Sequence, residues 1–282
     1  MTMDRMKNID LYKSFLNSEK PSIKWKSYFE IYNDLFQEYK NKKITFVEIG
    51  IDRGGSLFMW KDFFSKDTRI IGIDTNPETK KLEEYGFEIF IGDQSDENFW
   101  SNFYEKVGKI DILLDDGGHK NIEQIVTTMS SLPHVNNGGK IVVEDTHASY
   151  IKKHYRNPSM FSSISFFNLI VDSINRRCPM VNNTKANIYT NKVYSVNFYE
   201  SIVVLNIDEK KCSTNEVLFN NEHNKSVALN IEQVINKEEK TTISSQIEFF
   251  IIKHIKKIFN KKLLHNTFEK IKIFNIFRNI KH

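Results

Sequence analysis

The stretch ITFVEIGIDRGGS, residues 44–56, joins an apolar, β-rich segment to a glycine-containing turn. Its first part, Ile44–Ile49, is rich in β-branched and aromatic residues, which predicts a buried strand. Gly50, Gly54 and Gly55 then permit a tight turn and a close approach of a ligand to the backbone, because no Cβ blocks either. A strand followed by such a turn predicts the start of an α/β domain with a loop that holds a cofactor.

The same pattern, a short apolar segment that ends in an acidic residue, recurs along the next hundred residues. The predicted strands are Arg69–Ile73, Phe87–Ile91, Ile110–Leu114 and Lys140–Val143, with helices at Leu57–Phe64 and Asn121–Leu132 and a turn at Gly138–Gly139. Strands that alternate with helices predict a doubly wound, mostly parallel sheet. Two segments in close succession, Val193–Phe198 and Ser201–Leu205, predict an antiparallel edge at the C-terminal end of that sheet.

The chain is expected to hold one α/β domain, residues 44–207, between two extensions. Residues 1–43 carry aromatic residues at three- and four-residue steps, which predicts helices packed on the core, with a lid or dimer element as the alternative. Residues 208–282 are predicted to form a polar linker and a basic, amphipathic helical tail. That tail is expected to pack on the domain, with contact to an anionic membrane as the alternative.

Composition excludes several classes of protein. The two cysteines, Cys178 and Cys212, form no CxxC pattern, which argues against a disulfide framework or a zinc site and favours a reducing cytoplasm. The sequence shows no signal-peptide core and no apolar run as long as a membrane span. Residues 251–282 hold nine Lys/Arg against one acid, so the positive charge gathers in the tail and a nucleic-acid substrate is not expected.

Acidic residues end three successive predicted strands and suggest a cofactor site. A carboxylate at Asp74 can accept two hydrogen bonds from ribose hydroxyls, and Asp93 is placed to face an adenine amino group. Glu48, just before the glycine loop, suits a cofactor with an amine and a sulfonium charge. Asp52 stands where the dinucleotide fingerprint needs a glycine, which disfavours a nicotinamide cofactor. The alternative is that each of these acidic residues only caps a helix or forms a turn. That explanation is credible for any one of them, but less so for three acids at three successive strand ends.

Two acidic motifs, DDGGH at 115–119 and EDTH at 144–147, follow the fourth and fifth predicted strands. Because the carboxyl ends of parallel strands open on one side of a sheet, these side chains should converge. Crowded carboxylates repel each other, and a hard divalent cation relieves that repulsion through oxygen ligands. A hydroxyl bound to such a cation is more acidic, and His119, on a Gly–Gly turn, is placed to take its proton. For His147 a surface position remains an equal alternative.

These motifs together resemble the metal-dependent sugar O-methyltransferases of macrolide biosynthesis, of the mycinamicin and tylosin type. Cephalosporin-hydroxylase-like and rhamnosyl O-methyltransferase proteins are more distantly similar. The resemblance covers roughly Lys43–Tyr150, and Ser195–Val204 is similar to the family's last strands. It implies a Rossmann-like class I methyltransferase fold, with S-adenosylmethionine (SAM) and Mg²⁺ or a similar divalent cation as cofactors. The chain departs from the family at His147 and Gly118. These departures bear on which acceptor is methylated and leave the expected methyl-transfer chemistry unchanged.

The resemblance also implies roles for individual residues. It assigns the metal to Asp116, Glu144 and Asp145, and the proton-accepting base to His119. The residues expected to contact SAM are Glu48, Gly50, Gly54, Ser56, Asp74, Asp93, Gln94 and Asp115.

The expected activity is therefore the methylation of a sugar hydroxyl. Because the chain is rich in Asn, Lys, Ile and Phe, as is typical of an AT-rich bacterial genome, we favour a nucleotide-activated hexose or heptose for a surface polysaccharide such as a capsule over a macrolide. A homo-oligomer would be compatible with this activity. Two alternatives are a nicotinamide-dependent sugar oxidoreductase, disfavoured by Asp52, and a non-catalytic partner in glycan assembly, disfavoured by the intact acidic set.

Overall fold

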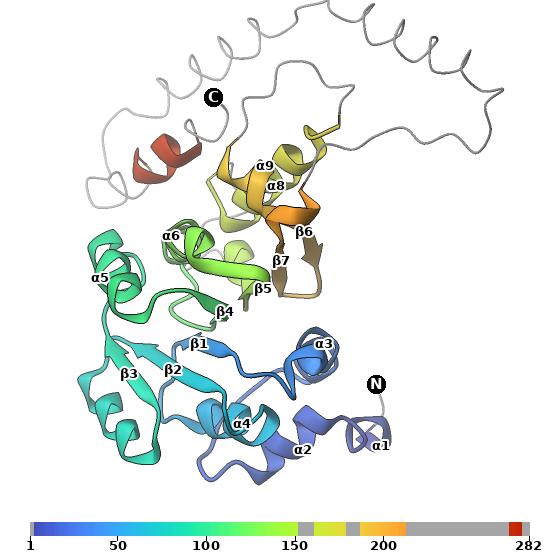
Figure 1. The fold of residues 1–282 in the computed structure, drawn as a ribbon, viewed down its shortest axis with the longest axis vertical. Helices are drawn as coiled ribbons and strands as arrows, with labels where there is room; N and C mark the ends of the chain where they lie inside the picture. Colours follow the sequence, from blue (N-terminus) through green and yellow to red (C-terminus); the bar gives the residue numbers. More distant parts are fainter. Residues whose placement is uncertain (1–2, 152–160, 179–186, 213–270, 278–282) are drawn as a thin grey trace, which may run out of the picture.

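The computed structural model describes residues 3–151, 161–178, 187–212 and 271–277. Seven strands form one sheet in the order β3-β2-β1-β4-β5-β7-β6 (Figure 1). The first five are parallel, and β7 runs antiparallel to both β5 and β6. This confirms the predicted doubly wound sheet with an antiparallel edge. The strands are β1 (Thr45–Ile49), β2 (Arg69–Asp74), β3 (Glu88–Ile91), β4 (Ile110–Asp115), β5 (Val135–Val143), β6 (Val193–Phe198) and β7 (Val203–Ile207).

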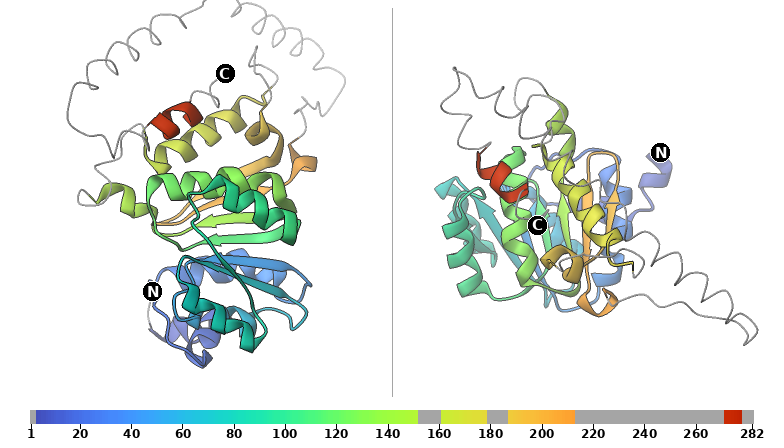
Figure 2. Two further views of the ribbon diagram at one scale, coloured as in Figure 1. Left: turned by 90° about the vertical axis from the view of Figure 1, so that its left-hand side faces the viewer. Right: turned by 90° about the horizontal axis from the view of Figure 1, so that it is seen from above.

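Helices cover both faces of this sheet (Figure 2). The α-helices are α1 (Met3–Met6), α2 (Asp10–Asn17), α3 (Tyr28–Phe36), α4 (Gly55–Phe63), α5 (Glu97–Val107), α6 (Asn121–Ser131), α8 (Ser163–Asn175) and α9 (Ile188–Lys192). The 3₁₀ helices are η1 (Gln37–Tyr39), η2 (Pro77–Tyr85), η3 (Leu132–His134), η4 (Thr146–Tyr150) and η5 (Glu209–Lys211). The predicted helices before β2 and before β5 are confirmed as α4 and α6, with ends that differ by one or two residues.

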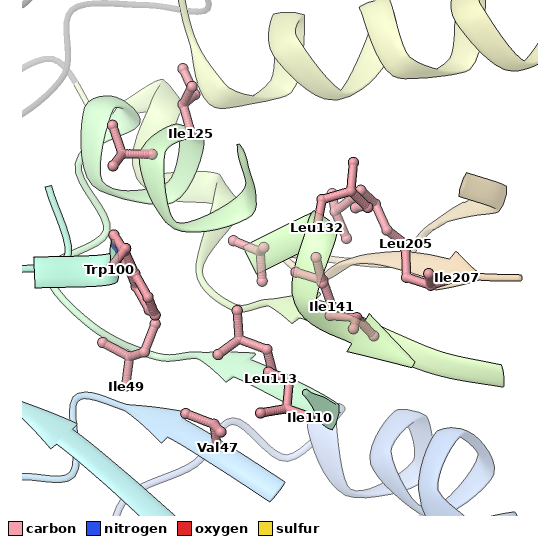
Figure 3. Close-up of a cluster of buried hydrophobic side chains, with 14 of the residues drawn as sticks. Val47, Ile49, Trp100, Ile110, Leu113, Ile125, Leu132, Ile141, Leu205 and Ile207 are labelled. Atoms are coloured by element: carbon pink, nitrogen blue, oxygen red, sulfur yellow. The ribbon is translucent and has the colours of Figure 1, made fainter. Parts of the chain in front are cut away.

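Strand alternation divides the core into two layers. Val47 and Ile49 of β1 pack with Trp100 of α5 and Ile125 of α6 on one face (Figure 3). Phe46, with the opposite orientation, packs on the other face with residues of α3 and α4. Both faces of the sheet are thus buried, which is why its central strands read as nearly continuous apolar runs.

The predicted turn at Gly138–Gly139 is wrong, because both glycines lie inside β5. The pairing of β4 with β5 shifts register between Ile110 and Ile112, so the glycines form an irregularity within the strand. Gly138 has a φ of +82° and its carbonyl accepts a hydrogen bond from the Tyr39 hydroxyl. A glycine pair is a local turn signal, and here pairing with the neighbouring strand overrides it.

The N-terminal extension packs on the domain, as the aromatic spacing predicted. Leu11 of α2 and Tyr28, Phe29 and Tyr32 of α3 are all buried in the core layer shared with α4. Between α2 and α3 the chain runs as a coil with little regular structure. That coil leads directly to the carboxyl edge of the sheet.

A short helix at 271–277 packs against the opposite layer, where Ile273 and Ile276 join the core. This agrees with the prediction of a tail packed on the domain, for the residues that are described. Of the predicted linker and tail, residues 213–270 and 278–282, including Ile251–Phe259, lie outside the described residues, so membrane contact stays an untested alternative. Within the described ranges, no helix is both long and apolar enough to cross a bilayer.

Candidate active site at the carboxyl edge of the sheet

Strand alternation decides which layer each acidic side chain faces. Glu48 follows Val47, whose side chain lies in the α5–α6 layer, so Glu48 points to the layer of α3 and α4. The same alternation along β5 sends Glu144 to the α3–α4 layer. Asp115, one residue after Leu114, points the other way and meets Gln94. Two buried carboxylates therefore share one face of the sheet, and a third is on the other.

A lysine from the N-terminal coil enters this acidic group. The side chain of Lys24 is only 3% exposed. Its Nζ donates to Asp116 Oδ2 at 2.5 Å and to Glu144 Oε1 at 2.7 Å, and lies 3.8 Å from Glu48 Oε1. One ammonium thus joins acids that the sequence had assigned to two different ligands. Sequence reasoning missed Lys24, because no local signal separates it from the other lysines of a polar segment.

Burial controls the charges of this group. Burial raises the pKa of Glu48 to about 7, with the Lys24 ammonium opposing that shift. Burial likewise holds the pKa of Glu144 well above its ordinary range. Although burial alone would lower the pKa of Lys24, the charges of Glu144, Asp116 and Glu48 raise it above its ordinary value. Lys24 therefore carries a full positive charge, while burial disfavours the ionised forms of Glu48 and Glu144.

His119 and Asp145 complete the site from the loops after β4 and β5. Asp145 Oδ2 lies 3.4 Å from His119 Nε2, and Asp145 Oδ1 accepts a hydrogen bond from the Tyr28 hydroxyl at 2.5 Å. His119 Nε2 is also 4.0 Å from Asp116 Oδ1. His119 Nδ1 is buried without a hydrogen-bond partner among the described residues. The imidazole of His119 therefore faces the carboxylates of Asp116 and Asp145 through Nε2 alone.

Asp116, His119 and Asp145 fit a divalent cation. Each offers one ligand atom, and these atoms all lie within 4.8 Å of one another. Carboxylate oxygens are the ligands that a hard cation such as Mg²⁺ prefers. Glu144, the third predicted metal ligand, lies outside this group of three, and one of its oxygens is bonded to Lys24, which also bonds Asp116. The structure thus brings the predicted ligands Asp116 and Asp145 together with the predicted base His119, and the binding of a metal stays a prediction.

The predicted cofactor residues fall into two groups by exposure. Asp74 is half-buried and accepts hydrogen bonds from the backbone N–H groups of Asp52, at 3.1 Å, and Asn76, at 2.8 Å, which ties the glycine loop to the end of β2. Asp93 is exposed after β3 and accepts a hydrogen bond from the Ser95 backbone. Both acids stand at strand ends on the β1–β3 side of the site, where a SAM adenosine would be expected.

The other predicted cofactor residues are tightly packed. Glu48, Ser56, Gln94 and Asp115 all have buried side chains. The Gln94 amide donates to Asp115 Oδ1 at 2.9 Å and accepts from the Gly118 backbone at 3.0 Å, so it joins the ends of β3 and β4. Burial raises the pKa of Asp115 to about 6. These side chains shape the loops around the site, and direct contact with SAM stays a prediction for them.

Glycine is required twice in the loop after β1. Gly54 has a φ of +84° and caps α4, and Gly50 has a φ of +81°. A Cβ on Gly50 would collide with the carbonyl oxygen of Asp116. The glycine loop and the loop that holds Asp116 are therefore in backbone contact, so the predicted cofactor and metal residues adjoin one another.

His147 and Trp25 flank the acidic group on its outer side. His147 Nδ1 is 3.8 Å from Asp145 Oδ1, and its ring meets the Trp25 ring edge to face at 6.2 Å. Trp25 is 60% exposed. His147, for which the sequence left a surface position open, thus lies half-buried beside the candidate metal ligands.

No family model matches the chain, but curated relatives match its central part. Demethylmacrocin O-methyltransferase of Streptomyces fradiae is 34% identical over 149 residues, which is 50% of this chain and 36% of the relative. A tetracenomycin-C rhamnosyl 2'-O-methyltransferase of Streptomyces olivaceus is 32% identical over 166 residues, 54% and 43% of the two chains. The central part of this chain is therefore similar to these O-methyltransferases. It spans less than half the length of these relatives.

Solved structures show the fold to which this chain is similar. MycE methyltransferase from the mycinamycin biosynthetic pathway, solved with Mg, SAH and mycinamycin VI, has a TM-score of 0.66 at 22% identity. The match covers 78% of this chain and 59% of MycE. The seven-stranded sheet with its antiparallel edge is thus the class I methyltransferase fold that the sequence predicted.

Proposed function

We propose that this chain is a SAM-dependent O-methyltransferase that uses a divalent cation and methylates a sugar hydroxyl. The observation that carries the proposal is the convergence of Asp116, His119 and Asp145 within 4.8 Å, next to the glycine loop. The strand order supports it, because the chain reverses its direction of winding between β1 and β4, and ligands of such sheets bind at that point. The proposed cofactor and metal sites adjoin on the two sides of this switch.

Methyl transfer from a sulfonium to an alcohol needs an oxygen that is held in line and loses its proton. Asp116, Asp145 and Glu144 are the residues that would hold the cation, which when bound orients the hydroxyl and stabilises the developing alkoxide. His119 takes the proton at Nε2, the ring nitrogen that faces the acidic group. The imidazolium that results is stabilised by the nearby carboxylates of Asp145 and Asp116. Tyr28 keeps Asp145 in place through its hydrogen bond.

The proposed cofactor position follows from the same geometry. Asp74 would accept hydrogen bonds from the ribose hydroxyls, and Asp93 would lie next to the adenine. The glycine loop would carry the methionine part between them and the acidic group. In that position the glycine loop and Asp74 would hold SAM beside the loops after β4 and β5, where the acceptor hydroxyl is proposed to bind.

For the acceptor, we propose a sugar hydroxyl in general and a nucleotide-activated hexose or heptose in particular. A sugar hydroxyl is supported by the relatives, whose names specify demethylmacrocin and a rhamnosyl tetracenomycin. A nucleotide-activated hexose or heptose for a surface polysaccharide rests on composition alone, and none of the named relatives acts on such a compound. The chain also spans less than half of those relatives' length, so their acceptors are not assigned to it.

A single assay separates the candidate functions. Purified protein is incubated with SAM, Mg²⁺ and a panel of nucleotide hexoses, nucleotide heptoses and a demethylated macrolide glycoside, and each product is examined for the mass of one added methyl group. The proposal expects methylation of at least one sugar, and no reaction when NAD replaces SAM. Oxidation of a sugar with NAD would overturn it in favour of an oxidoreductase. Failure to bind SAM in calorimetry would overturn it in favour of a non-catalytic role.

A further inference from the structure

Residues 18–27, here called the strap, run as a coil across the carboxyl edge of the sheet. The strap is anchored on both sides of the site. Ser18 Oγ donates to the Gly55 carbonyl at 2.7 Å at its start, and Tyr28, just past its end, donates to Asp145. The strap also passes so close to α4 that a Cβ on Gly55 would collide with the Pro21 carbonyl. It therefore touches both the glycine loop and the acidic group.

The strap places its Lys24 ammonium among the oxygens that the proposed function gives to a metal. Nζ is 2.5 Å from Asp116 Oδ2 and 2.7 Å from Glu144 Oε1. A Mg²⁺ ion bound to the same two oxygens would need to lie at about 2.1 Å from each. Two cations cannot occupy that space together. Either the ion takes only the oxygens that Lys24 leaves free, or it takes the place of Lys24.

The surroundings of Lys24 favour displacement. Its neighbours Ile23 and Trp25 are 95% and 60% exposed, and the strap has no helix or strand to hold it. Glu48, on β1, and Glu144, directly after β5, are in contrast fully buried. Buried ionised carboxylates without a cation are strongly unfavourable, so the ammonium leaves only when another cation replaces it. A doubly charged ion offsets the repulsion among these carboxylates more strongly than one ammonium does, and it favours their ionised forms.

We propose that Lys24 is the counter-ion of the metal-free site, and that a divalent cation displaces it and so lifts the strap from the acceptor side. This inference rests on the proposed function for the nature of the ion. Metal binding and opening of the strap then occur together. As a result, the acceptor can enter the site only when metal is bound. The strap thus acts as a cover of the site.

Chemical labelling of lysines on the intact protein tests the displacement. The full chain is treated briefly with an acetylating reagent, with and without saturating Mg²⁺, and labelling is read at each lysine by mass spectrometry. Lys24 is expected to be protected without metal and to gain about tenfold or more in labelling with metal. Lys26 is exposed on the same strap and serves as the internal control, with labelling that should not change.

Metal binding to a Lys24→Met variant gives a second, independent reading. Because no ammonium has to leave, this variant should bind Mn²⁺ more tightly by about tenfold or more in calorimetry, while Lys26→Met stays near wild type. A near-native circular dichroism spectrum and a cooperative thermal transition report that the variant is folded. Metal binding with Lys24 still protected in the wild type would overturn displacement and leave the proposed function intact. Absence of metal binding in both wild type and Lys24→Met would overturn the metal requirement itself.

Discussion

His119 and Asp145 both have positive φ angles, +57° and +53°, although neither is glycine. This region is strained for residues with a Cβ, and such strain gathers where side-chain direction matters for function. At both positions the chain turns sharply just after a parallel strand, β4 or β5. The turns bring the imidazole and the carboxylate to 3.4 Å from each other. At the residue scale, then, the left-handed backbone conformations of His119 and Asp145 position the proposed base next to a proposed metal ligand.

Replacing His119 by alanine should reduce turnover by about 10²–10⁴-fold, because the acceptor hydroxyl loses its base. SAM binding should stay near wild type, because the proposed SAM contacts lie on other strands. His147→Ala is the matched control, since its ring also lies near Asp145 but on the outer side. Single-turnover kinetics and SAM calorimetry on both variants check this. A His119→Ala enzyme within a few-fold of wild type would falsify the proposed role of the base.

Gly50→Ala should be much more harmful than Gly86→Ala. Both glycines have nearly the same φ, +81° and +85°, so the intrinsic backbone strain, about 1–2 kcal/mol, is matched. A Cβ on Gly86 meets nothing within 4 Å, whereas one on Gly50 collides with the Asp116 carbonyl. Urea unfolding should show a larger loss of stability for Gly50→Ala, and calorimetry a weaker affinity for metal. Equal losses in the two variants would show that the two loops are not in contact.

At the scale of elements, the site is framed by segments from far along the chain. The strap comes from the N-terminal extension, and the helix at 271–277 lies against α5 and α8. Lys272 Nζ is 2.9 Å from Glu97 of α5 and 3.3 Å from the carbonyl of Ser95, one residue after Gln94. This helix thus braces the loop after β3, where the adenine is proposed to bind.

Removal of a buried side chain from this helix should destabilise the domain. Ile276→Ala is expected to cost about 2 kcal/mol or more, because Ile276 is only 8% exposed in the core beside α8. Ile271→Ala, in the same helix, should change stability by no more than about 0.5 kcal/mol, because Ile271 is 41% exposed. Thermal and urea unfolding of both variants measure this. Equal stability of the two would mean that the helix does not pack on the domain in solution.

At the scale of the whole molecule, the proposed cofactor site and the proposed metal site lie mainly on different halves of the sheet. The proposed cofactor residues lie on or after β1, β2 and β3, except Asp115 at the end of β4, and the proposed metal residues follow β4 and β5. The two halves meet between β1 and β4, where Gly50 contacts Asp116. In the proposed reaction, the methyl group would therefore move only from the loop after β1 to the loop after the neighbouring strand β4.

This division predicts separable effects of the two ligands. EDTA should abolish methyl transfer and Mg²⁺ should restore it, while SAM affinity changes little, because the metal and cofactor residues are distinct. Mg²⁺ and SAM should each raise the melting temperature, since each binds the folded state. Activity assays and thermal melts with each ligand alone and with both provide the measurement. Full activity in EDTA would contradict the metal mechanism and leave the fold assignment standing.

The sequence by itself determined the strands of the parallel half, the glycine loop and the acidic strand ends. These follow from local signals, because burial on both faces produces apolar runs and ligand-binding loops need particular residues directly after a strand. The placement of Glu48 and Glu144 on one face also follows from alternation along their strands. The family resemblance added the expected metal and base residues, and the geometry brings those residues together.

Only the tertiary structure decided the place of Lys24, the two glycines in β5 and the packing of 271–277. Lys24 meets Asp116 and Glu144 across 92 and 120 residues of sequence, and no local pattern reports such a contact. The glycines of β5 carry a turn signal that the hydrogen bonds of a neighbouring strand outweigh. Local patterns report burial and backbone conformation, whereas the pairing of distant charges depends on where the folded chain brings them.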